Sequence, residues 1–142
     1  MTIKDDLLKL RSGGTTEEVT ATEAGSITLT RDATTGKVVV QIDKCPEGGI
    51  PIEVICDADT GTSSDKTMIV TIEASDSLAT GYIVVATFPT MTFADTAAIR
   101  FVRRIATQKK YLRSVITVAG SNGTISRAIE ILVGVGLVDQ DA

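Results

Sequence analysis

Apolar and polar residues alternate with a period of two through most of this 142-residue sequence, and no other feature constrains its fold as much. Such alternation puts apolar side chains on one face of a β-strand and polar side chains on the other. The alternating runs are residues 27–29, 38–42, 50–56, 68–74, 82–88, 112–118 and 125–133. The run at 82–88 predicts one apolar strip made of Tyr82, Val84, Ala86 and Phe88.

Turn residues separate these runs, among them Gly36, Gly61 and Gly81. Asn122-Gly123 lies between two runs and predicts a β-hairpin with a type I′ turn, since both residues tolerate a positive φ. No helical period interrupts the runs, so we expect seven or eight short strands. That pattern predicts an all-β, antiparallel β-sandwich of jelly-roll or immunoglobulin-like topology.

The chain divides into an arm at 1–14, one β-sandwich domain at 15–138 and a short acidic tail at 139–142. In the arm, Leu7, Leu8, Leu10 and Arg11 precede a flexible Gly-Gly pair. The arm is a short helix or an extended segment, and it docks on a neighbour or on its own domain. No apolar run approaches the ~20 residues that span a bilayer, so we expect no membrane partner. The N-terminus lacks a signal-peptide pattern, which predicts synthesis in the cytoplasm.

The sequence has no histidine, which excludes Ser-His-Asp and Cys-His nucleophile pairs and histidine-based metal sites. No pair of carboxylates is marked for acid–base work, so we expect no catalytic residue, no cofactor and no enzymatic activity. A carboxylate enzyme would need two acids in one cleft. Residues 57–61 resemble the start of a calcium loop, but Gly61 and Met68 stand at ligand positions, so we expect no metal. For Cys45 and Cys56 we expect two reduced thiols.

Charge is unevenly distributed along the chain, whose net charge is −4. Residues 96–129 hold seven of the fourteen basic residues and no acid. A basic segment on an acidic molecule predicts contact with an oppositely charged patch, on another copy or on a charged partner. The overall acidity and the 4% aromatic content argue against a nucleic-acid partner.

Residues 109–120 read Lys-Lys-Tyr-Leu-Arg-Ser-Val-Ile-Thr-Val-Ala-Gly. This stretch resembles the C-terminal signature of the Bbp16 family of tailed-phage capsid cement (decoration) proteins. There a Tyr-Leu-Arg strand leads into a Thr-Val-Ala-Gly turn and a final apolar strand. Residues 19–29 and 70–76 are similar to the family's N-terminal and central strands. The chain departs from the family pattern at 103–108 and at Arg127, where small residues are usual.

The resemblance implies a jelly-roll that forms a homotrimer on the outer capsid surface of the virion. There it would bridge neighbouring major capsid proteins and stabilise the shell against internal DNA pressure. The residues expected to make these contacts are Leu7, Leu8, Leu10, Arg11, Arg103, Arg104, Lys109 and Lys110. The residues alone leave a second possibility open, a generic β-sandwich binding module of carbohydrate-binding or adhesion type.

Overall fold

The structure is a computed structural model that describes residues 48–77 and 79–133, and the backbone of four short strands before them. The strands are β1 (Lys9–Arg11), β2 (Glu18–Val19), β3 (Glu23–Ala24), β4 (Val40–Gln41), β5 (Ile50–Cys56), β6 (Thr67–Ser75), β7 (Ile83–Thr87), β8 (Met91–Thr92), β9 (Ile99–Ile105), β10 (Tyr111–Ala119) and β11 (Arg127–Val133). Within these ranges no helix has the length and apolar character needed to cross a membrane.

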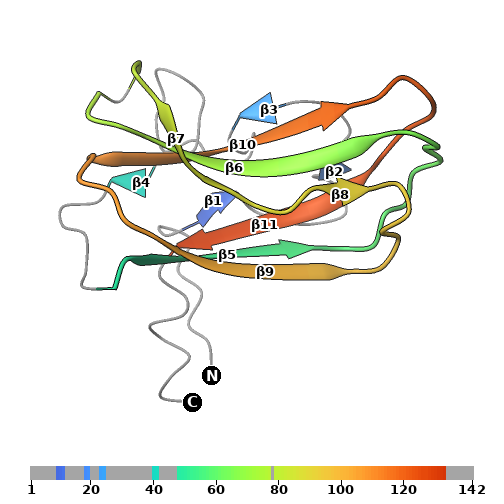
Figure 1. Ribbon diagram of the computed structural model, residues 1–142, viewed down its shortest axis with the longest axis horizontal. Helices are drawn as coiled ribbons and strands as arrows, with labels where there is room; N and C mark the ends of the chain where they lie inside the picture. The colour runs from blue at the N-terminus through green and yellow to red at the C-terminus, as the bar shows by residue number, and fades with distance from the viewer. Residues whose placement is uncertain are drawn as a thin grey trace, which may run out of the picture.

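The strands form two antiparallel sheets that face each other (Figure 1). The five-stranded sheet has the order β1-β11-β5-β9, with β2 also paired to β11. The six-stranded sheet has the order β3-β10-β6-β7, with β4 also on β10 and β8 also on β6. The sequence-based expectation of an all-β antiparallel sandwich is confirmed.

The strand order identifies the sandwich as a jelly-roll. Each of the pairs β1/β2, β3/β4 and β7/β8 shares one neighbour, so the eleven strands occupy eight positions along the chain. The first position pairs with the last, the second with the seventh, the third with the sixth and the fourth with the fifth. This is an antiparallel ribbon of four strand pairs folded over on itself, the arrangement of a double-sheet jelly-roll.

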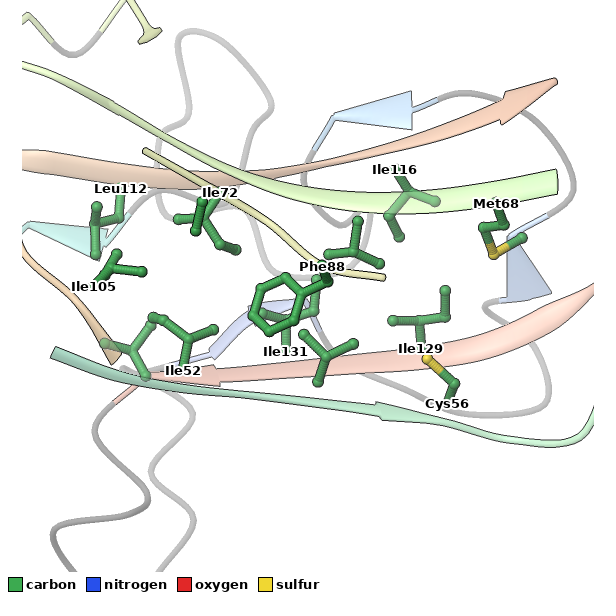
Figure 2. Close-up of a cluster of buried hydrophobic side chains, with 14 of the residues drawn as sticks. Ile52, Cys56, Met68, Ile72, Phe88, Ile105, Leu112, Ile116, Ile129 and Ile131 are labelled. Carbon is green, nitrogen blue, oxygen red and sulfur yellow. The ribbon is translucent and has the colours of Figure 1, made fainter. Parts of the chain in front are cut away.

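The core lies between the two sheets and is built by the alternation of the strands. In β6, Met68, Val70, Ile72 and Ala74 are buried while the residues between them are only half-buried. Together with Leu112 and Ile116 of the neighbouring strand β10, these side chains meet aliphatic residues of β5 and β11 from the opposite sheet (Figure 2). Burying one such side chain stabilises the fold by about 1.5–3 kcal/mol, so the core as a whole holds the two sheets together.

The prediction of a hairpin at Asn122-Gly123 is wrong. Residues 120–126 connect β10 in the six-stranded sheet to β11 in the five-stranded sheet, so the flanking strands are not paired. Gly123 has a φ of 74°, whereas no described non-glycine residue has a positive φ. The carboxylate of Asp65 holds the loop instead, accepting the N–H groups of Ser121 and Asn122 at 3.1 and 2.9 Å.

The prediction of one apolar strip in residues 82–88 is correct only in its second half. The register between β6 and β7 shifts opposite Ile72 and Glu73, and Val85 is the extra residue. A bulge of this kind reverses the faces on which successive side chains lie. Ala86 is therefore buried, whereas Val84 is 55% exposed.

The arm takes part in the five-stranded sheet. Leu10 and Arg11 belong to β1, which pairs antiparallel with β11, so this part of the arm is extended and docks on its own chain. Leu7, Leu8 and the tail at 139–142 lie outside the described residues, as do the run at 27–29 and most of the run at 38–42.

We expect Gly120→Ala to destabilise the protein more than Gly48→Ala. Both glycines have a positive φ, 106° and 82°, so either alanine carries a backbone strain of about 1–2 kcal/mol. A Cβ at position 120 would also lie 2.7 Å from the Cα of Lys66, while at position 48 the nearest atom is 4.0 Å away. The total cost at Gly120 should reach about 2–4 kcal/mol in urea unfolding. Equal losses for the two variants would contradict the steric argument.

Candidate functional site

The predicted basic residues gather at one end of the sandwich. Arg103 and Arg104 lie near the end of β9, and Lys109 and Lys110 follow in the connection to β10. Arg104 pairs with Pro51 at the start of β5, and the start of β10 pairs with the end of β6. The structure therefore brings these four residues to the end where β5 and β10 begin.

Three of these basic side chains have polar contacts in the structure, and each contact joins two segments of the chain. Arg103 donates from Nη1 to the carbonyl of Thr87 in β7, at 2.7 Å, and so connects the two sheets. Arg104 donates to the carbonyl of Gly49 at 3.3 Å. Lys109 forms an ion pair of 3.0 Å with a carboxylate, that of Asp76.

Leu10 and Arg11 of the arm lie away from this basic group. β1, which carries Leu10 and Arg11, lies at the opposite edge of the five-stranded sheet from β9, with β11 and β5 between them. Neighbouring strands lie about 4.8 Å apart, so β1 and β9 are separated by about 14 Å. Leu10 and Arg11 thus lie at one edge of the five-stranded sheet, and Arg103 and Arg104 lie at the other.

Exposed aliphatic side chains lie on both of the strands that Arg103 connects. Ile83 and Val84 of β7 are 54% and 55% exposed, and Val84 lies across from Glu73 on the outer face of the six-stranded sheet. Val102 of β9 is 55% exposed on the five-stranded sheet, next to Arg103 and Arg104. Sequence reasoning missed Val102, although a valine in phase with the polar residues of its strand is a readable signal of an exposed apolar surface.

A third arginine of β9 differs from Arg103 and Arg104 because a carboxylate neutralises it. Arg100 donates from Nε to Oε1 of Glu53 in β5, at 2.5 Å. The side chain of Glu53 is only 8% exposed, so the acid is held beneath the arginine. In the described part of the chain, Arg103 and Arg104 contact carbonyl groups and no carboxylate.

The outer face of the six-stranded sheet carries a second polar group. Arg113 and Glu73 face each other across β10 and β6 and form an ion pair of 2.5 Å between Nη2 and Oε2. The guanidinium of Arg113 also lies over the ring of Tyr82, 4.0 Å from its centroid. Tyr111 precedes Arg113 by two residues and shares its face.

The acidic turns use their carboxylates to hold backbone in place. Asp59 accepts the N–H groups of Gly61 and Ser126 at 2.8 and 3.0 Å, so its turn joins β5 to the start of β11. Hydrogen bonds from Asn122 and Ser121 lower the pKa of Asp65. Among the residues that the structure describes, no three His, Cys, Asp or Glu side chains converge to hold a metal ion.

Arg127 is buried in the core and takes no part in the basic surface. Its side chain is 0% exposed and faces inward between Ile125 and Ile129. Nη1 donates to the carbonyls of Asp57 and Ala97, at 3.0 Å each, which ties β11 to the end of β5 and the segment before β9. Its Nε and Nη2 have no partner among the described residues. The alternation at 125–133 was the sequence signal for this inward position.

Comparisons with known proteins found likeness among solved structures. No family model and no curated protein matches the chain. Among solved structures, it is similar to the CBM22-1 xylan-binding domain of Xyn10C from Paenibacillus barcinonensis. The two share 11% identity with a TM-score of 0.42, over 94% of this chain and 97% of that one.

Cys56 carries a free, buried thiol in β5. Burial is the main cause that raises the pKa of this thiol to about 11, and the charge of Asp57 adds to it, while nearby Arg127 opposes it. The expectation of a reduced thiol is confirmed at this position, whereas Cys45 lies outside the described residues.

We expect the thiol of Cys56 to make the protein less stable above about pH 9. The unfolded thiol ionises near its ordinary pKa of 9.0, while the folded one stays neutral up to about 11. Stability is therefore unaffected by this group below pH 9 and is lost as the pH rises from 9 to 11, by about 2–3 kcal/mol in all. Urea unfolding in a Cys45→Ser background should show this loss, and Cys56→Val should remove it. Parallel pH profiles for the two proteins would contradict the argument.

Proposed function

We propose that this chain is a non-catalytic jelly-roll domain that acts by binding the surface of another macromolecule. The observation that carries the proposal is strand β9, where Val102 is 55% exposed next to Arg103 and Arg104, which contact no described carboxylate. Exposed apolar groups next to uncompensated charge are typical of protein interaction sites. The turn acids Asp59 and Asp65 are engaged with backbone N–H groups, which suits structural roles better than acid–base chemistry.

The more specific proposal is a phage capsid cement protein. It is supported by the sequence resemblance in residues 109–120, and it is compatible with the jelly-roll fold, which occurs in viral capsid and lectin domains alike. A protein that binds only the assembled lattice stabilises that lattice by mass action. If it forms a homotrimer, three weak contacts act together through avidity.

The placement of the predicted contact residues suits a bridging role. Leu10 and Arg11 lie on β1 at one edge of the five-stranded sheet, while Arg103 and Arg104 lie on β9 at the other. A domain with contact residues on two edges can touch two neighbouring major capsid proteins at once. A single contact patch would tie the domain to one neighbour only.

A carbohydrate-binding module is the second candidate, favoured by the outer face of the six-stranded sheet. Tyr82 and Tyr111 lie there with Arg113 and Glu73, a combination of aromatic rings and charged hydrogen-bonding groups that suits a sugar ligand. The guanidinium of Arg113 already covers one face of the Tyr82 ring, and a sugar stacking on that face would have to displace it.

We expect this chain to bind mature phage heads and to raise their resistance to heat. Heads of a phage that encodes it, stripped of the protein, should release DNA at a lower temperature than complete heads, because lattice binding stabilises the assembled state. Adding the purified chain back should restore the original temperature and should place the chain in the pellet with the heads. Identical release temperatures with and without the chain would rule out the cement function.

A glycan array tests the second candidate with the same purified chain. If the outer face binds sugars, Tyr111→Ala should abolish binding of any glycan that the unaltered chain retains. The substitution removes the aromatic ring on which the sugar would stack. Val102→Ala, on the other sheet, serves as the matched control and should bind normally. An array without hits excludes this candidate.

A further inference from the structure

Strand β9 is the longest edge strand in the described part of the sandwich. It spans seven residues and pairs on one side with β5 through seven consecutive positions without a register shift. No described strand pairs with its other side. In an antiparallel ladder, alternate residues turn their N–H and C=O groups away from the neighbour, so β9 presents an unused row of hydrogen-bonding groups along this side.

Most devices that protect such an edge are missing from β9. Proteins usually shorten an edge strand, bend it with a bulge or place a proline in it. The neighbouring edge uses two of these devices, since β7 contains a bulge and β8 has only two residues. β9 has a regular register and no proline, so charge is what restricts its pairing.

That charge is of one sign and selects against a second copy. β9 contains Arg100, Arg103 and Arg104 and no acid. Pairing of β9 with β9 of another copy would bring like charges into cross-strand positions, which is unfavourable. An acidic strand would instead find Arg103 and Arg104, which no described carboxylate neutralises. The same residues thus reject one partner and attract another.

The outward face of β9 specifies the pattern of such a partner. Arg100, Val102 and Arg104 alternate along the strand and point away from the core, while Phe101 and Ile105 point into it. Val102 is 55% exposed between the two arginines. Since Glu53 already neutralises Arg100, the matching strand has an aliphatic side chain against Val102 and an acid at the alternate position beside Arg104.

We propose that β9 is the docking edge for an extended acidic segment of the protein that this domain binds, which adds to the five-stranded sheet as a further strand. The inference rests on the proposed binding function and names the chemistry of its partner. Main-chain hydrogen bonds to the edge supply affinity, and the exposed Val102 with Arg104 supplies specificity, as in other strand-addition complexes.

A labelled peptide tests this edge directly. The probe is the seven-residue peptide Thr-Glu-Thr-Val-Thr-Glu-Thr with blocked ends, and its binding to the full chain is measured by fluorescence anisotropy at low salt. We expect it to bind at least about tenfold more tightly than the same peptide with lysine in place of glutamate. Two further peptides keep the charge but carry N-methyl groups on the backbone, one peptide at its odd-numbered residues and the other at its even-numbered residues. Each can therefore no longer donate one of the two alternating sets of main-chain hydrogen bonds. At least one of them should lose binding by a similar factor.

Variants of the chain locate the site. Arg104→Glu should weaken binding of the peptide about tenfold or more, while Lys66→Glu, the same charge change outside β9, should leave it within about twofold. Arg104→Gln serves as a milder change if the glutamate variant fails to fold by circular dichroism. Amide resonances of β9 should shift on binding in an NMR titration.

Three results would overturn the proposal: no binding of the glutamate peptide, binding of both N-methylated peptides as tight as that of the unmodified peptide, or equal weakening by Lys66→Glu and Arg104→Glu. Failure of the edge and failure of the proposed function are distinguishable. If the wild-type chain and Arg104→Glu pellet with heads equally well and the wild-type chain does not bind the peptide, the cement function stands and only the docking edge is refuted. A chain that binds the peptide but not heads keeps the edge and loses the cement function.

Discussion

The packing of two apolar sheet faces against each other holds every other feature of this domain in place. The longest ladder, β6 with β10, pairs nine residues on each strand and lines one side of the core. The opposite side is lined by β5 and β11. These two strands are also buried on the face that points away from the core, where Pro51 and Leu132 lie. Since close packing leaves little room for change, the middle of the sandwich is committed to stability.

The binding function that we propose therefore uses the edges and outer faces. The described acidic turns are held by their own hydrogen bonds, and Glu53 and Glu73 are engaged with arginines across the strands. What remains available is the long edge of β9, with Val102 exposed between charged neighbours, and the tyrosine-bearing face of the other sheet. Both are surfaces suited to binding, and neither resembles a cleft in which two carboxylates could act on a substrate.

Arg127 shows the cost of placing a charge inside such a core. Two carbonyl groups accept hydrogen bonds from one of its nitrogens, yet two other nitrogens have no described partner. Removing one member of a buried polar contact usually destabilises a protein more than the contact itself stabilises it. The arginine nevertheless fixes three chain segments relative to one another, at the end of the sandwich opposite to the basic group of Arg103 and Arg104.

The sequence by itself determined four of the long strands and their apolar sides, because a period of two follows from the pleat of any single strand. This is why the runs at 50–56, 68–74, 112–118 and 125–133 were predicted correctly. The sequence did not predict β9, where no alternating run was identified. Only the tertiary structure decided the rest. A bulge opposite Glu73 turned Val84 outward, and the crossing between sheets replaced the hairpin expected at Asn122. The exposed edge of β9 exists because strand order, which depends on contacts between distant segments, gave this strand β5 as its one described neighbour.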